Sequence, residues 1–177
     1  MPELPDVEIF RRYMESTGLH QKIEKVQVRK ERVLQDITPQ KLSRALKGCR
    51  FESTRRQGKF LFVETDGKYW LVLHFGMTGY LKYFKDIAED DKHDRLLFTF
   101  ENGYHLAYVN QRLLGEVALT ESVEAFNEKR HLGQDAWEMP AEQFKEILSK
   151  GTATVKSALM KQEQIAGIGN IYGDEVL

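Results

Sequence analysis

Residues 60–74 read FLFVETDGKYWLVLH, and this stretch decides the fold. Two runs rich in aromatic and β-branched residues flank Asp66-Gly67, and this dipeptide between such runs is one of the strongest short signals for a β-hairpin. The arrangement recurs where Asn102-Gly103 separates residues 96–100 from residues 104–109. Successive hairpins predict an antiparallel β-sandwich or barrel over residues 49–119.

The segment before this β-rich region predicts two helices and one more strand. Residues 6–17 carry apolar side chains at helical spacing and end at Gly18, and a strand is expected over residues 23–28. Thr38-Pro39 then supplies an N-cap and a first-turn proline for a helix that ends at Gly48.

After residue 119 the pattern predicts helices and no further strands. One helix is expected from Pro140 to Lys150, with Gly151 as its end, and Thr154 is expected to cap a second helix over residues 155–161. A glycine-rich turn at residues 167–169 precedes the start of a last helix, whose first N–H groups are expected to face a phosphate.

These patterns together predict an α+β protein. The first domain, residues 1–120, is expected to be an antiparallel β-sandwich flanked by helices, and residues 121–177 are expected to form a separate helical module. Because the sequence stops about two turns into the last helix, we expect it to be a truncated piece of a longer protein.

Composition excludes some classes of protein and leaves others open. The 177 residues carry a net charge of -1, which does not by itself indicate a nucleic-acid binder, although basic residues concentrate between residues 22 and 59. No apolar run approaches the roughly 20 residues of a membrane span, and no signal peptide is indicated. Cys49 is the single cysteine, which excludes an internal disulfide and a cysteine-rich zinc site and favours a cytoplasmic setting.

The opening Met1-Pro2-Glu3 suggests a nucleophile. Removal of Met1 would leave Pro2 with a free secondary amine, and an α-amino group has a pKa near ~8, so part of it is neutral at physiological pH. Such amines attack aldehydes and hemiacetals to give iminium intermediates, and a neighbouring carboxyl group such as Glu3 can act as general acid or base. Taken alone, the same residues also fit a proline that merely survives processing.

Four motifs in order along the chain carry a family resemblance: residues 2–8 (PELPDVE), Gly58-Lys59, residues 74–79 (HFGMTG) and residues 167–172 (GIGNIY). With these motifs the sequence resembles the formamidopyrimidine-DNA glycosylase/endonuclease VIII family of bifunctional base-excision repair enzymes. The resemblance extends from the first residue to the last and implies that residues 121–177 are an incomplete helix–two-turn–helix DNA-binding module.

The resemblance also implies a reaction and its catalytic residues. Pro2 is the residue that attacks the sugar C1′, displaces the damaged base and forms a Schiff base, after which β,δ-elimination cuts the strand. Glu3 looks like the acid that protonates the sugar ring oxygen. Asp6 stands where the family commonly has glutamate and is expected to support this pair. Lys59 resembles the lysine that contacts a phosphate beside the lesion, although without the other motifs it reads as a solvated turn residue.

Further residues match positions that contact DNA in the family. Met77 matches a side chain that fills the space left by the extruded base, and Arg112 matches the arginine that faces the orphaned partner base. Leu114 replaces a phenylalanine wedge, while Asn110, Gln111 and Leu113 depart from the usual aspartate, proline and arginine. The remaining expected DNA contacts, along the backbone, are His74, Lys156, Asn170 and Tyr172.

The implied partner is damaged double-stranded DNA, bound by a monomer away from any membrane, in the cytoplasm at the bacterial nucleoid. No cofactor or metal is expected in this chain, because the zinc of many family members lies in a C-terminal finger beyond it. Two alternatives remain open: a module that binds damaged or abasic DNA with weakened or lost catalysis, and, more remotely, a small-molecule enzyme with an N-terminal proline base. Neither the preferred lesion nor the preferred opposite base follows from the sequence.

Overall fold

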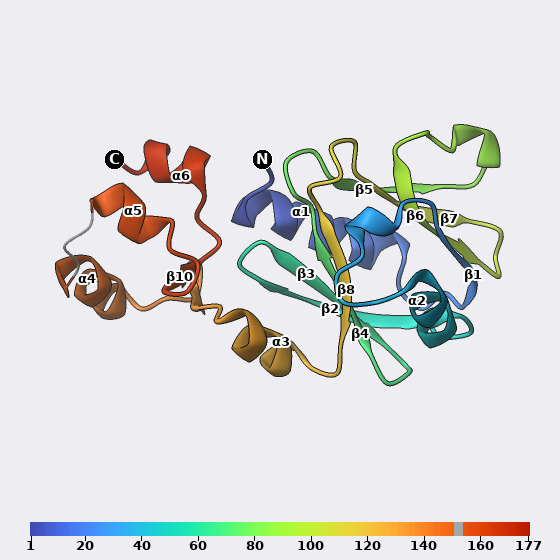
Figure 1. Cartoon of the computed structure of the whole chain (residues 1–177), viewed down its shortest axis with the longest axis horizontal. Coiled ribbons are helices and arrows are strands. Elements are labelled where there is room, and N and C mark those ends of the chain that lie inside the picture. The colour runs from blue at the N-terminus through green and yellow to red at the C-terminus, as the bar shows by residue number, and fades with distance from the viewer. Residues whose placement is uncertain (151–153) are drawn as a thin grey trace.

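The computed structural model describes residues 1–150 and 154–177, and its main strands form two four-stranded antiparallel sheets (Figure 1). The first sheet has the order β1 (Ile23–Val28), β6 (Asp94–Phe100), β7 (His105–Val109) and β5 (Tyr80–Phe84). The second has the order β2 (Phe51–Gln57), β3 (Phe60–Thr65), β4 (Trp70–His74) and β8 (Glu116–Thr120). These sheets and their flanking helices confirm the predicted α+β class.

Both hairpin signals lie where the sequence predicts turns. Asp66-Gly67 separates β3 from β4, and Asn102-Gly103 separates β6 from β7. Gly103 has a φ of +82°, a conformation that glycine adopts without steric cost. Local turn chemistry therefore accounts for the β3–β4 and β6–β7 pairs, whereas β1–β6, β5–β7 and β4–β8 pair strands that are not joined by a hairpin turn.

The second sheet is covered on both faces. Leu61 and Val63 of β3 point into the core between the sheets, whereas Phe62 points to the other face. There Phe62 packs near Val123 and Phe126 of α3 (Val123–Arg130). Since burial of one phenylalanine side chain contributes roughly 1.5–3 kcal/mol, α3 stabilises a face that would otherwise expose apolar surface.

Two N-terminal helices flank the sandwich as predicted. Helix α1 (Leu4–Thr17) packs against β2, β3 and β5, and the N–H of Gly18 caps its end by donating to Met14 O at 2.9 Å. Helix α2 (Pro39–Leu46) begins after Thr38, whose hydroxyl accepts from the N–H of Lys41. Two short 3-10 helices, η1 (Glu31–Val33) and η2 (Ile87–Glu89), lie in connections.

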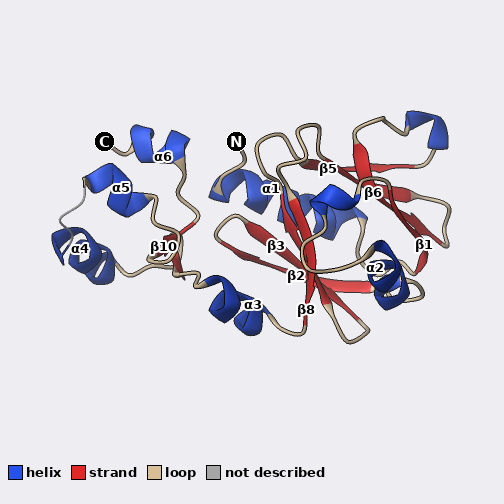
Figure 2. Cartoon of the chain, in the orientation of Figure 1, coloured by secondary structure: helices blue, strands red, loops and turns tan. Residues whose placement is uncertain are grey.

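The C-terminal part contains α4 (Ala141–Lys150), α5 (Val155–Leu159) and α6 (Asn170–Glu175). Figure 2 shows that these helices gather around a small pair of strands, apart from the two sheets. Thr154 caps α5, which is shorter than expected, and the predicted stop at Gly151 lies outside the described residues. The domain boundary expected after residue 120 falls between β8 and α3 and stays a prediction.

The expectation of no strands after residue 119 was wrong. Besides the end of β8, strands β9 (Gln134–Asp135) and β10 (Ile165–Ala166) pair in parallel. Each has two residues, too few for a period-2 pattern, and their pairing depends on contacts across the fold rather than on local sequence. A strand therefore precedes the glycine-rich turn at residues 167–169, where a helix was expected. None of the described helices is long and apolar enough to span a bilayer.

Candidate active site

Hydrogen bonds join the first residues of the chain to the start of α6. Glu3 is completely buried, and its carboxylate accepts three backbone hydrogen bonds from α6 and the residue before it. The N–H of Gly169 donates to Oε2 at 2.8 Å, that of Ile171 to Oε1 at 2.8 Å and that of Tyr172 to Oε2 at 3.3 Å. These N–H groups were expected to face a phosphate. In the structure they donate to the Glu3 carboxylate, which satisfies N–H groups that have no partner within the helix.

Asp6 fixes the backbone of Glu3. The N–H of Glu3 donates to Asp6 Oδ2 at 2.9 Å, as in a helix capping box with the acid at the third helical position. The N–H of Leu4 donates to Gly167 O at 3.2 Å, which ties the same turn of α1 to the glycine-rich segment. Pro2, next to Glu3, is half-buried.

Lys59 joins the group from the turn between β2 and β3. Gly58 precedes it with a φ of +56°, and Lys59 itself is half-buried. Burial lowers the pKa of Lys59, and the nearby Glu3 carboxylate partly offsets this effect. A Cβ on Gly169 would lie 2.5 Å from Lys59 Nζ and 2.6 Å from Glu3 Cδ, so both side chains lie against Gly169 and a larger residue there would displace them.

Two loops at the same end of the sandwich pack against each other. One runs from Phe75 to Gly79 between β4 and β5, and the other covers residues 110–115 between β7 and β8. A Cβ on Gly76 would lie 2.5 Å from the carbonyl group of Leu114, which shows that the two backbones touch. Met77 and Leu114 are 40% and 46% exposed, and Arg112 is exposed as well.

Asn110 holds these loops together from below. It is 0% exposed, its amide nitrogen donates to Phe75 O and to the Tyr108 hydroxyl at 3.1 Å each, and its Oδ1 accepts from the N–H of Leu114 at 3.2 Å. The side-chain amide therefore acts as both donor and acceptor, a combination that a carboxylate lacks.

Comparison with known proteins identifies the family of this arrangement. The profile of the formamidopyrimidine-DNA glycosylase N-terminal domain matches residues 1–117. The chain belongs to the formamidopyrimidine-DNA glycosylase family. Two relatives with this family's name, from Moorella thermoacetica and Bacillus subtilis, are 35% and 36% identical to it. Each alignment covers 100% of this chain and 66% of the relative, so the chain spans about two thirds of their length.

Solved structures of formamidopyrimidine-DNA glycosylases agree with this fold. The wild-type Lactococcus lactis enzyme in complex with DNA containing N7-benzyl-Fapy-dG aligns with a TM-score of 0.91 at 32% identity. The complex of the L. lactis enzyme with abasic-site DNA has the same TM-score at 31% identity. Each alignment covers 99% of this chain and 66% of the other.

The four residues expected to contact the DNA backbone of a formamidopyrimidine-DNA glycosylase substrate differ in burial and in their partners. His74 is packed against Phe60 with 4.9 Å between ring centroids, its Nδ1 accepts from the N–H of Gly76 at 3.3 Å, and burial lowers its pKa. Lys156 is ion-paired with Asp174 of α6. Asn170 and Tyr172 are exposed at the start of α6. A role in DNA contact stays a prediction for all four.

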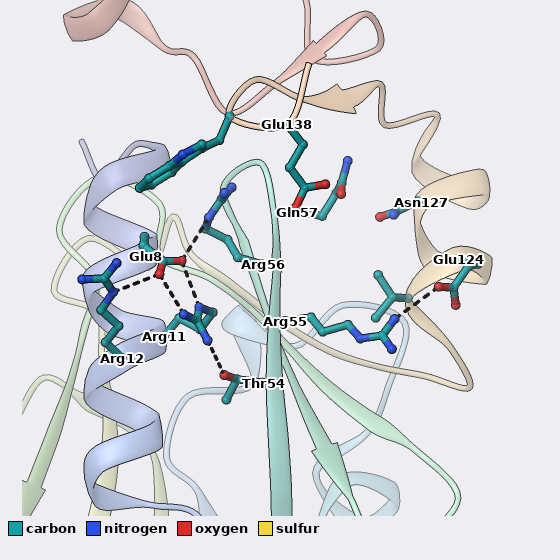
Figure 3. A pocket seen from close by; sticks show the side chains of 12 residues that line it. Glu8, Arg11, Arg12, Thr54, Arg55, Arg56, Gln57, Glu124, Asn127 and Glu138 are labelled. Atoms are coloured by element: carbon teal, nitrogen blue, oxygen red, sulfur yellow. Dashed lines mark hydrogen bonds and ion pairs between the residues drawn. The ribbon is translucent and has the colours of Figure 1, made fainter. Parts of the chain in front are cut away.

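Sequence reasoning missed the ion pair between Arg56 and Asp135, although Arg56 stood inside the basic segment. Arg56 borders a polar pocket of about 530 Å³ beside α1 (Figure 3), which Arg11, Arg12 and Arg55 also line. The pocket does not include Pro2, Glu3 or Lys59. Among the described residues, no group of three or more His, Cys, Asp or Glu side chains could hold a metal ion.

Proposed function

We propose that this chain carries the catalytic centre of a base-excision repair DNA glycosylase with abasic-site lyase activity. The observation that carries this proposal is the junction of Glu3, Lys59 and Gly169 beside Pro2. The Glu3 carboxyl group and the Lys59 ammonium group both lie against Gly169 there, and Pro2 is the residue before Glu3. The family name of the relatives and the abasic DNA in a related complex support the same chemistry.

In the proposed reaction, the Pro2 nitrogen forms a bond to C1′ while the bond from C1′ to the damaged base breaks. The sugar ring then opens as the C1′–O4′ bond breaks and O4′ takes a proton, and the nitrogen lone pair completes the iminium. The Pro2 nitrogen loses its single proton as the iminium forms, and the departing base, which leaves with the bonding electron pair, takes up one proton in exchange. Loss of the C2′ proton expels the 3′ phosphate, and a second elimination expels the 5′ phosphate.

Glu3 is suited to deliver the proton to O4′. Its Oε1 accepts one backbone hydrogen bond while Oε2 accepts two, so Oε1 retains a free lone-pair position for a proton. Lys59 supplies positive charge for a phosphate next to the opened sugar. Met77, Arg112 and Leu114 are proposed to enter the duplex where the extruded nucleotide leaves a hole, which costs a few kcal/mol to create.

The proposed partner is damaged duplex DNA, bound by a monomer in the bacterial cytoplasm at the nucleoid. Ring-opened purines are the first lesions to test, because the relatives are named for formamidopyrimidines. His74, Lys156, Asn170 and Tyr172 are proposed to line the path of the DNA backbone, and Asp6 to support Glu3.

Borohydride trapping on an oligonucleotide with one abasic site, at low salt, tests this proposal. The chain is used with Pro2 confirmed as its first residue by mass spectrometry, and we expect a covalent adduct that maps to Pro2. The matched control retains an uncleaved extension before Pro2 and should form no adduct. Strand cleavage by the blocked chain, or tight binding of abasic DNA by the free chain without any adduct, would contradict the proposal.

A further inference from the structure

Arg56 lies at the junction of three segments that surround the candidate active site. Its side chain is 7% exposed and forms a two-pronged ion pair with Asp135, in which Nη2 donates to Oδ1 at 3.0 Å and Nη1 binds Oδ2. Nη1 also donates to Gly58 O at 3.0 Å. Nε faces Glu8 Oε2 of α1 at 3.5 Å, an ion pair drawn in Figure 3.

Asp135 collects further donors around this ion pair. It is 2% exposed, and it accepts from the N–H of Gly58 at 2.7 Å and from the N–H of Trp137 at 3.0 Å in addition to Arg56. Next to it, the Gln57 side chain donates to Gly133 O at 2.8 Å. The turn that carries Lys59 is thus fastened to residues 133–137 through one carboxylate and its neighbours.

The same contacts continue to the glycine-rich turn. Asp135 and Gln134 form β9, which pairs with Ala166 and Ile165 of β10 directly before Gly167. A Cβ on Gly58 would lie 2.9 Å from Ala166 Cβ and 3.1 Å from Gly167 N, so the two turns touch where Gly58 lacks a side chain. A continuous set of contacts therefore runs from Arg56 to both Lys59 and the segment whose N–H groups hold Glu3.

A buried ion pair is seldom the most stabilising choice, because the desolvation of two charges can exceed their attraction. An apolar pair of similar volume would fill this space, but it would leave the N–H groups of Gly58 and Trp137 without their acceptor. The Asp135 carboxylate therefore satisfies these two N–H groups and, at the same time, fixes Gly58 and Arg56 relative to residues 135–137.

We propose that Arg56 and Asp135 are positioning residues, which hold the Lys59 turn and residues 167–170 in place around Pro2 and Glu3. This inference rests on the proposed function. Neither residue needs to touch the DNA: their effect reaches the reaction through the position of Lys59 and of the Glu3 carboxylate.

The test is Arg56→Lys, which keeps the charge but cannot bind both carboxylate oxygens. We expect adduct formation at saturating abasic DNA to slow by about 10- to 100-fold, because small displacements of reacting groups have effects of that size. The Kd for the abasic oligonucleotide should stay within about threefold of wild type. The control is Arg55→Lys on the same strand, where Arg55 is exposed and pairs with Glu124 at 3.5 Å; its rate should not change.

The outcomes separate positioning from a merely structural role. If Arg56→Lys lowers the melting temperature but forms adduct at the wild-type rate well below that temperature, the proposal is overturned. If the variant does not fold, Asp135→Asn decides, because it removes the charge that pairs with Arg56, keeps an amide oxygen as acceptor and leaves the Lys59 turn itself unaltered: a 10-fold slower rate supports the proposal, and an unchanged rate overturns it.

The positioning role of Arg56 can be tested even if the proposed function is wrong. If wild type forms no adduct, amide NMR shifts of Lys59, Gly167 and Gly169 are compared between Arg56→Lys and Arg55→Lys. Shifts in all three amides for Arg56→Lys alone would support positioning even without lyase activity. Unchanged shifts would overturn it.

Discussion

Asn110 joins the two loops that carry Met77 and Leu114, and it illustrates what a single buried amide contributes. Resemblance marked it as a departure from the family's aspartate, but its donors to Phe75 O and Tyr108 and its acceptor for Leu114 are visible only in three dimensions. On α1, Glu8 also joins several partners through one side chain: its carboxylate forms ion pairs with Arg11, Arg12 and Arg56.

Replacing Asn110 with alanine should lower the free energy of unfolding by about 2–3 kcal/mol. The change leaves the Leu114 N–H and the Phe75 carbonyl without their buried partner, and unsatisfied groups cost about 1–3 kcal/mol. Urea unfolding measures the effect. Gln111→Ala, one residue further along and exposed, should change stability by less than about 0.5 kcal/mol; an equal loss in both variants would show that Asn110 has no special role.

Glu8 should make the free energy of unfolding depend on pH in the acidic range. Its hydrogen bonds to Arg11, above all, lower its pKa from 4.5 to about 2. Because the folded pKa is depressed, the stabilisation is complete above pH 4.5 and is lost as pH falls toward 2; it amounts to at most about 3 kcal/mol. Glu8→Gln should therefore be less stable at pH 7 and lose less stability between pH 4.5 and 2. Glu15→Gln, on the same helix but 39% exposed, is the control for charge, and an unchanged acid profile in Glu8→Gln would contradict this account.

At the scale of elements, the first turn of α1 and the start of α6 depend on each other, although 166 positions separate Glu3 from Gly169. Hairpin turns, the Thr38 cap and the amphipathic helices were predictable because each depends on neighbouring residues. The pairing of β9 with β10 and the ion pair between Arg56 and Asp135, 79 positions apart, were not, because nothing local distinguishes Asp135 from an exposed acid.

Gly169 and Gly173 provide a matched test of the α1–α6 junction. Gly169→Ala should slow adduct formation by more than about 100-fold, since its Cβ would displace Lys59 Nζ and the Glu3 carboxyl group, and misplacement of such groups has effects of this order. Gly173 lies within α6, and in Gly173→Ala the new Cβ meets only ordinary contacts of 3.6 Å or more with Met160 and Lys156, so this variant should react normally. It should also gain up to about 1 kcal/mol of stability from helix propensity. Equal rates for the two variants would argue against the junction as the reactive site.

At the scale of the whole molecule, a net charge of -1 means that the DNA binding proposed above would have to come from local basic groups rather than from an overall positive field. The four motifs were enough to predict the family, since they occur along the chain in the order and at the spacing that the family shows. It did not reveal that Lys156 is already paired with Asp174, because this pairing depends on how α5 and α6 pack.

Lys59→Ala should reduce the slope of log Kd against log salt concentration by about 1, as expected for the loss of one phosphate contact. Fluorescence anisotropy with an abasic oligonucleotide between low and physiological salt measures this slope. Lys68→Ala is the control, because Lys68 lies in the next turn of the same sheet, between β3 and β4, and is paired with Glu121. A slope that changes equally in both variants would remove Lys59 from the phosphate contact.

The hydrogen bonds between Glu3 and residues 169–172 can form only late in the synthesis of the chain. Gly169, the first of the three N–H donors to be made, follows Glu3 by 166 positions in the chain. At about 5–20 residues per second, this delay lasts roughly ten to thirty seconds. During that interval the nascent chain contains Pro2 and Glu3 but lacks the N–H groups that hold the Glu3 carboxylate, so the activity proposed above would begin only after Tyr172 has been made.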